Sequence, residues 1–141
     1  MIKLEKLPSD ILDRLREAEG VLAQDGNVVF AYLFGGLAKN EIRPLSDIDI
    51  AVHLRETINL AEYKLLLFDR ISDALGTDEL DLVILNTAPI SITGRILQDK
   101  LTLVDKEPFL RHRFESLKLR EFFDFKIKEE AFFARRYNVG G

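Results

Sequence analysis

The spacing of apolar and polar residues changes several times along this chain. Apolar residues recur every three or four positions from Ile11 to Leu22 and again from Asn59 to Leu75, which predicts two amphipathic helices. Ser9 or Asp10 can cap the start of the first helix, because a short polar side chain there accepts from a free backbone N–H. Gly76 follows the second helix and suits its C-terminal cap.

Three segments have the character of β-strands. Val28 to Phe34 is a continuous β-branched and aromatic run, which predicts a strand buried on both faces. Ser46 to Leu54 and Asp78 to Leu85 alternate instead, so each should bury one face and leave the other more polar. The more polar faces carry Asp47, Asp49, Ala51 and His53 in the first of these segments, and Glu79, Asp81 and Val83 in the second.

The rest of the pattern predicts further helices and one more strand. We expect a helix from Pro89 to Gln98, a short strand from Leu101 to Val104, and one long helix or a helix pair from Pro108 to about Tyr137. Helices that alternate with strands predict an α/β or α+β fold, with a mixed sheet covered by helices. The length predicts a single domain over residues 1–141, with its core at about 28–104.

Composition narrows the chemistry that the chain can perform. It has no cysteine and two histidines, so carboxylates are the main candidates for binding a metal, and they favour hard ions such as Mg²⁺. Apolar residues make up 47% and charged residues 31%, as in an ordinary soluble protein. The net charge of −4 argues against binding nucleic acid by bulk electrostatics. No segment resembles a membrane span or a secretory signal, so we expect a cytoplasmic protein without a membrane partner.

Charge and aromatic residues gather unevenly along the chain. Residues 1–108 carry 12 basic and 19 acidic side chains, a net of −7, whereas residues 109–141 carry 8 and 5, a net of +3. The second segment also holds 8 of the 13 aromatic residues. It therefore either covers the sheet or presents an aromatic and basic surface to another protein. The acidic residues within it disfavour a nucleic-acid partner.

A glycine pair and an aspartate pair are the main candidates for chemistry. Gly35 and Gly36 end the buried strand, and a glycine turn allows phosphate to approach backbone N–H groups closely. Ten residues later come Asp47 and Asp49, whose Cα atoms should lie about 6–7 Å apart on one face of a strand. The two carboxylates are either a solvated sheet face or ligands for a metal.

Asp81 can complete the set if its strand lies beside that of Asp49. Clustered carboxylates repel one another unless a cation or added protons offset their charge. Two divalent ions about 3.5–4 Å apart form the usual arrangement for phosphoryl displacement. Phosphate-binding amides beside such a cluster would suit nucleotidyl transfer from a triphosphate. His53 shares the aspartate face and is expected to pack rather than to react.

These motifs resemble those of the polymerase-beta-type nucleotidyltransferases, and specifically their minimal nucleotidyltransferase (MNT) branch. The family pattern is Gly-Ser, ten residues, then Asp-any-Asp, and this chain reads "FGG", ten residues, then "DIDIAV". The stretches "RPLSDIDIAV" and "ELDLVILNTAPISITGRIL" are also similar, so the resemblance runs from about Val28 to Val104. The tail "DFKIKEEAFFARRY" is similar to the end of such proteins.

The resemblance implies roles for individual residues. Asp47 and Asp49 would bind two Mg²⁺ ions, and Asp81 would be a third ligand or the base toward an acceptor hydroxyl. The triphosphate of ATP would be held by Gly35 and Gly36. From their place in the loop, Lys39 and Arg43 either contact phosphate as well or are solvated charges. Two positions depart from the family pattern: Gly36 stands where serine is usual, and Asn40 replaces a common glycine.

The resemblance also implies a partner. Small MNT proteins are similar to the MntA-type antitoxins of type VII-like toxin–antitoxin pairs, which can transfer AMP from ATP to a tyrosine of a HEPN-domain ribonuclease toxin. The short chain offers little room for an acceptor domain of its own, so the partner would supply one. A non-catalytic antitoxin that neutralises its partner by binding is the first alternative. Transfer to a small molecule such as an aminoglycoside is the second.

Overall fold

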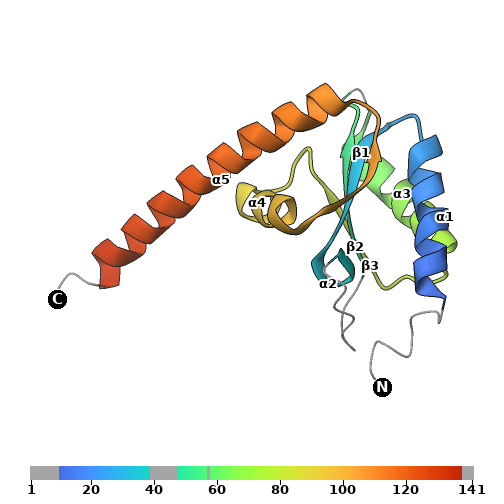
Figure 1. Ribbon diagram of the computed structural model, residues 1–141, viewed down its shortest axis with the longest axis horizontal. Coiled ribbons are helices and arrows are strands. Elements are labelled where there is room, and N and C mark those ends of the chain that lie inside the picture. The colour runs from blue at the N-terminus through green and yellow to red at the C-terminus, as the bar shows by residue number, and fades with distance from the viewer. Residues whose placement is uncertain (1–9, 39–47, 57, 138–141) are drawn as a thin grey trace, which may run out of the picture.

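The computed structural model describes residues 10–38, 48–56 and 58–137 and shows a four-stranded sheet between two layers of helices (Figure 1). The strands follow the order β3-β2-β1-β4 across the sheet. Their bounds are β1 Val28–Phe34, β2 Ile48–Leu54, β3 Leu80–Ile84 and β4 Leu101–Asp105. The helices are α1 Ile11–Gln24, α2 Gly35–Ala38, α3 Leu60–Leu75, α4 Ile90–Asp99 and α5 Pro108–Tyr137.

The sheet is mixed, as the alternation of helices and strands predicted. Strand β1 pairs antiparallel with β2 on one side and with β4 on the other. Strand β3 runs parallel to β2, because the chain crosses back through α3 between them. The predicted strand 78–85 is shorter than expected, since the Glu79 N–H donates to Thr77 Oγ1 in a turn that precedes Leu80. Residues 46 and 47 of the other predicted strand lie outside the described ranges.

One face of the sheet packs against α1 and α3 (Figure 1). The alternation in β2 determines this face, since its four apolar side chains all point toward these helices and are fully buried. They are Ile48, Ile50, Val52 and Leu54. Ala18 and Leu22 from α1, and Leu67, Ile71 and Leu75 from α3, complete the same core. Burying a side chain of this size stabilises the fold by about 1.5–3 kcal/mol.

The opposite face carries α4 and the first half of α5. Phe30 and Tyr32 of β1 are fully buried here against Ile96 of α4 and Phe114 of α5. Strand β1 is therefore buried on both faces, as its continuous apolar run predicted. The more polar side of β2 and β3 lies on this face, so the aspartates of these two strands lie on the side of the sheet that α4 covers.

The ends of the two predicted amphipathic helices differ in how they are capped. Asn59 caps α3 by accepting from the Glu62 N–H at 3.2 Å, and Gly76 ends the helix in the left-handed conformation, as predicted. Asp10 occupies the cap position of α1, but its side chain accepts no backbone N–H there. Its carboxylate instead accepts from Arg14 Nε at 3.0 Å, so the predicted capping role of Asp10 is wrong. Ser9 lies outside the described residues.

A buried polar network fastens α5 to the sheet. The Tyr32 hydroxyl donates to Glu115 Oε2 at 2.7 Å, and Lys100 Nζ and Arg111 Nη1 lie 3.2 and 3.0 Å from the same carboxylate. Burial and the bond to Glu115 raise the pKa of Tyr32 well above its ordinary value. Burial alone would raise the pKa of Glu115, but hydrogen bonds from Tyr32 and Lys100 outweigh it and hold that pKa below the ordinary value.

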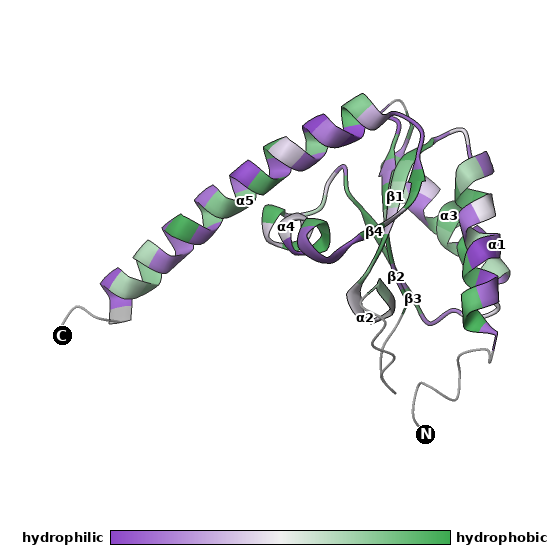
Figure 2. Ribbon diagram, in the orientation of Figure 1, coloured by the Kyte–Doolittle hydropathy of each residue, from purple (hydrophilic) through white to green (hydrophobic). Residues whose placement is uncertain are grey.

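Helix α5 is a single helix of 30 residues rather than a pair, and only its first half covers the sheet. Phe122 is buried against Gly94 of α4, where the missing side chain leaves room for the aromatic ring. Beyond Phe122 the helix projects away from the sheet, with hydrophobic positions recurring along it (Figures 1 and 2). Exposed side chains there include Phe123, Ile127, Phe132 and Phe133. Along the described residues, neither α5 nor any other helix is long and apolar enough to span a membrane.

Candidate functional site

Two of the three predicted metal ligands lie side by side at one end of the sheet. Asp49 of β2 is aligned with Asp81 of β3 in the parallel pair, and with Phe34 of β1 on its other side. Aligned residues of neighbouring strands are about 4.8 Å apart and project from the same face. The condition that the two strands be neighbours is therefore met, and both aspartates point to the side that α4 covers.

Gly35 follows directly on β1 and is in contact with Asp49. Its φ of 73° lies in the left-handed region, which favours glycine. A Cβ placed on Gly35 would overlap the Asp49 carboxylate, with Asp49 Cγ only 3.0 Å away. Position 35 therefore requires glycine for two independent reasons, the backbone conformation and the space that the carboxylate occupies.

The predicted helical turn after the glycine pair is observed as α2, which includes Gly36 and ends at Ala38. The structure thus brings together four of the predicted site residues, Gly35, Gly36, Asp49 and Asp81. Asp47, Lys39 and Arg43 lie outside the described residues, so their predicted roles stay predictions.

A pocket of about 470 Å³ opens beside Gly35 and Asp81, beneath α4. Apolar side chains form most of its wall, and Arg95 and Asp99 of α4 add one charge of each sign. The apolar wall consists of Phe34, Val83, Ile92 and Ile96. Arg95 is the residue that sequence reasoning missed. Helical spacing could have identified it: Arg95 and Asp99 follow Ile92 by three and seven residues and therefore lie on the same face of the helix.

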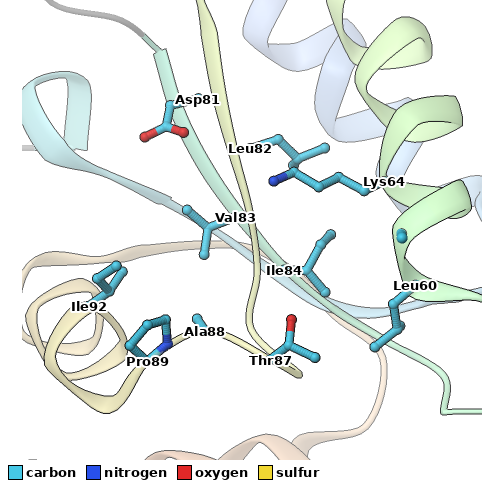
Figure 3. Close-up of a pocket in the computed structure, with 11 residues that line it drawn as sticks. Leu60, Lys64, Asp81, Leu82, Val83, Ile84, Thr87, Ala88, Pro89 and Ile92 are labelled. Carbon is cyan, nitrogen blue, oxygen red and sulfur yellow. The ribbon is translucent and has the colours of Figure 1, made fainter.

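A second pocket of about 530 Å³ lies on the other side of Asp81, along β3 (Figure 3). Four consecutive β3 residues, 81–84, line it. Leu60 and Lys64 of α3 stand on one side, and Pro89 and Ile92 at the start of α4 stand on the other. Asp81, Val83 and Ile92 line both pockets, so the Asp81 carboxylate stands where the two meet.

The residues at this end of the sheet fit a magnesium ion. Carboxylate oxygens are the ligands that Mg²⁺ prefers, and the paired strands present those of Asp49 and Asp81 side by side. Over residues 10–38, 48–56 and 58–137, no group of three or more His, Cys, Asp or Glu side chains is placed to hold a metal. The predicted set of three requires Asp47, which is not among those residues.

His53 is half-buried and packs on aromatic side chains, in line with the expectation that it packs rather than reacts. Its ring stacks on Phe30 with centroids 4.8 Å apart and meets the edge of Phe114 at 5.2 Å. Burial lowers the pKa of His53 below its ordinary value, and the charges of Glu56 and Glu107 oppose that shift only in part. Within the part of the chain that the structure describes, its buried Nδ1 atom makes no hydrogen bond.

Comparison with known proteins agrees with this geometry. Residues 16–109 match the family model described as "Polymerase beta, Nucleotidyltransferase". A chain of the MntA–HepT toxin–antitoxin crystal structure has a TM-score of 0.65 and 20% identity, with 92% of this chain and 98% of that chain covered. A chain of a toxin–antitoxin structure with AMP-PNP has a TM-score of 0.61 and 20% identity, over 91% and 94% of the two chains.

A third solved structure contains a tri-AMPylated HEPN toxin of Shewanella oneidensis in complex with an MNT antitoxin. One of its chains has a TM-score of 0.61 and 20% identity, and the match covers 100% of both chains. A search of curated proteins finds no match. At this level of identity the solved structures show a shared fold.

Proposed function

This chain belongs to the polymerase-beta-type nucleotidyltransferases and has their fold with a long C-terminal helix, and we propose that it transfers AMP from ATP to a protein hydroxyl. The observation that carries the proposal is the alignment of Asp49 with Asp81 beside Gly35. The two carboxylates can bind divalent ions, and the adjoining glycine turn has no side chain that would keep a triphosphate away.

Asp47 and Asp49 would hold Mg²⁺ in this site, and of the two roles expected for Asp81, a third ligand or the base, we assign it the base. When bound, Mg²⁺ supplies positive charge that offsets the charge developing on the phosphate oxygens. The chain's own contribution is to keep the carboxylates in place. Parallel pairing of β2 with β3 aligns Asp49 and Asp81, and Gly35 leaves the room that the Asp49 carboxylate occupies.

In the proposed reaction, the acceptor oxygen forms a bond to the α-phosphorus of ATP, and the bond from that phosphorus to the pyrophosphate oxygen breaks. The hydroxyl proton passes to the Asp81 carboxylate, which is exposed and lines both pockets. Gly35 and Gly36 would lie against the triphosphate, since neither has a side chain to keep it away. Arg95 would neutralise phosphate charge from the α4 side, and Lys39 and Arg43 are further candidates for this role.

We propose a HEPN-domain toxin as the partner and one of its tyrosines as the acceptor. Several solved structures with this fold are toxin–antitoxin complexes, and in one of them the partner is a tri-AMPylated HEPN toxin. The outer half of α5 supports a protein partner, because Ile127 and Phe132 are 65% and 56% exposed there. Under this proposal the chain is the antitoxin of the pair, and AMP transfer silences the toxin.

A non-catalytic antitoxin is the second candidate, and Gly36 favours it. Serine at this position would offer a hydroxyl to phosphate, whereas glycine offers only its N–H. A protein with this fold can still neutralise a partner by covering its active site. The two functions differ in whether neutralisation needs the carboxylates.

One experiment separates the candidates. The protein is mixed with Mg²⁺, ATP labelled at the α-phosphate, and a purified HEPN toxin encoded beside it, and both labelling and ribonuclease activity are measured. Label on a toxin tyrosine that disappears in Asp49→Asn but persists in Asp69→Asn, an exposed change on α3, is the expected result. Neutralisation without label, unchanged in Asp49→Asn, would establish the binding function and overturn the enzymatic one.

A further inference from the structure

Strand β3 has a free edge that leads to Asp81. It is the last strand on its side of the described sheet, with β2 on the other side. Glu79 accepts from the Ile48 N–H at 3.0 Å and Leu85 donates to the Val52 carbonyl at 2.8 Å, so the odd-numbered residues face β2. Because backbone groups alternate along a strand, the N–H and C=O of Leu82 point outward.

These outward groups form the floor of the groove along β3. Of the two even-numbered residues that line it, Ile84 already uses its carbonyl to accept from the Thr87 N–H at 3.3 Å. The register of the parallel pair leaves the N–H and C=O of Leu82 without a partner on β2, and the residue is only 3% exposed, at the bottom of the groove. A strand edge with free donors and acceptors pairs with water or with another extended backbone.

Residues of α3 and of the start of α4 form the two walls of the groove. Ala61 and Lys64 of α3 line the groove. In Figure 3, Lys64 stands on one side of β3, and Pro89 and Ile92 stand on the other. The carboxylate of Asp81 stands at one end of the groove and Thr87 at the other. The groove therefore leads an extended chain to the residue to which we assign the acceptor proton.

We propose that the acceptor reaches Asp81 as an extended peptide that adds to the free edge of β3 as an additional strand. This inference rests on the function proposed above and names the form in which the substrate is presented. Main-chain hydrogen bonds to Leu82 supply affinity, and pockets on alternate sides supply specificity. The occupant is a segment of the partner protein that contains a hydroxyl residue.

The two walls of the groove determine which peptide side chain is expected on each side. Asp81 and Val83 face the α4 side, where Pro89 and Ile92 offer apolar contact to an aromatic ring, so a tyrosine belongs on that side. Lys64 stands on the α3 side, where it complements an acidic side chain. Since successive side chains of a strand point to opposite faces, the acceptor and the acidic residue are separated by an odd number of positions.

The first test measures binding without nucleotide. A positional-scanning library of peptides with a central tyrosine is selected on the immobilised protein, and the best peptide is then synthesised with each amide N-methylated in turn. We expect affinity to fall about tenfold or more at alternate positions only, because only those N–H groups face β3. Selected peptides should carry acidic residues at odd spacing from the tyrosine. Uniform tolerance of N-methylation overturns the proposal.

Hydrogen exchange of the Leu82 amide gives a direct readout on the protein. We expect this amide to exchange at least tenfold more slowly when the peptide is bound than in the protein alone. Protection that is absent with the peptide overturns strand addition. Protection that already exists in the free protein and grows with its concentration shows that a second copy occupies the edge, and it also overturns the proposal.

Variants of the groove walls test whether the peptide binds in this groove or elsewhere on the surface. Ala61→Trp should block the groove and weaken peptide binding at least tenfold, whereas Asp69→Trp on an exposed face of the same helix should not. Lys64→Glu should change the preferred peptide residue from acidic to basic. Equal binding by the Ala61 and Asp69 variants would contradict the assigned groove.

Failure of the proposed function is distinguishable from failure of this inference. AMP transfer to the peptide is compared with transfer to N-acetyltyrosinamide, which has no flanking strand. If Ala61→Trp lowers only the first, both proposals stand. If neither acceptor is labelled while Leu82 is protected and N-methylation acts at alternate positions, the docking mode stands and the transferase function fails.

Discussion

Asp49 and Asp81 are aligned across two neighbouring parallel strands, and Gly35 leaves room for the first of these carboxylates. Each strand alone shows an acidic residue on a polar face. Their alignment turns two separate residues into one site at the edge of two pockets.

The carboxylates should be needed for activity and not for folding. Asp49→Asn and Asp81→Asn are each expected to lower AMP transfer by about 100-fold or more, since the first removes a proposed metal ligand and the second the proposed base. Steady-state labelling measures the loss, and thermal melting without divalent ions should leave Asp81→Asn at least as stable as the wild type, because like charges are separated. Asp78→Asn, an exposed change just before β3, serves as the control. Wild-type activity in both site variants would remove these residues from the mechanism.

Gly35 and Gly20 should respond to alanine in opposite directions. Gly35→Ala combines a left-handed φ with an overlap on Asp49, so we expect a loss of unfolding free energy of about 1–2 kcal/mol or more, along with lost activity. Gly20 lies inside α1 with nothing within 4 Å of its Cβ position, so Gly20→Ala should add about 0.5–1 kcal/mol. Urea denaturation measures both, and a neutral Gly35→Ala variant would contradict the described turn.

Packing of α5 on α4 depends on Gly94 and Phe122. A Cβ at Gly94 would overlap the Phe122 ring, with Cδ2 only 2.6 Å away, so Gly94→Ala should destabilise the protein by about 1–3 kcal/mol. Phe122→Leu offers a smaller partner, and the double variant should recover part of that loss. A double-mutant cycle from denaturation curves gives the coupling energy. Simple additivity of the two changes would show that the side chains do not meet.

His53 should make stability depend on pH below about 6.5. Burial lowers its folded-state pKa below 6.5, so as the pH falls through 6.5 the unfolded chain takes up a proton that the folded protein does not. Stability contributed by neutral His53 is therefore present above pH 6.5 and is lost below it, by at most about 1.4 kcal/mol per pH unit. The lowered pKa of Glu115 acts in a more acidic range.

Denaturation curves at several pH values test this dependence. His53→Phe should flatten the slope in that interval, whereas His112→Gln, on the exposed side of α5, should retain it. An unchanged slope in His53→Phe would assign the effect to other groups.

The outer half of α5 should matter for partner binding rather than for folding. Replacing Ile127 and Phe132 with serine removes exposed apolar area, so the unfolding free energy should stay within about 0.5 kcal/mol. Affinity for the proposed HEPN partner, measured by calorimetry, should fall at least tenfold. Lys128→Ser on the same stretch is the matched control, and an unchanged affinity of the apolar variant would place the interface elsewhere.

Local patterns in the sequence predicted most of the fold. The alternation in β2 indicated which side chains reach the core, and Asn59 and Gly76 marked the ends of α3 because their capping is a local interaction. Of the two caps predicted for α1, Asp10 does not act as one, since its carboxylate binds Arg14 instead of the backbone and the residue type does not reveal that choice. Helix α5 was predicted in length, but its direction depends on the contact between Phe122 and Gly94.

Part of the candidate site could be predicted in the same way, and part could not. Gly35 and Asp49 belong to one motif with fixed spacing, so the sequence indicated them together. The place of Asp81 beside Asp49 depends on the order of strands in the sheet, which is a long-range property. Arg95 was missed because it enters the site only through the packing of α4 across from Gly35.

The projecting part of α5 has a thermodynamic consequence for association. Residues 131–136 are all exposed, so helix formation there depends mainly on local propensity, which is marginal for short segments in water. These last turns should therefore open by fraying at much less than the free energy of global unfolding. A partner that binds these residues must hold them in the helical state. Part of the binding free energy is then spent on forming the helix, so the affinity should weaken as the temperature rises.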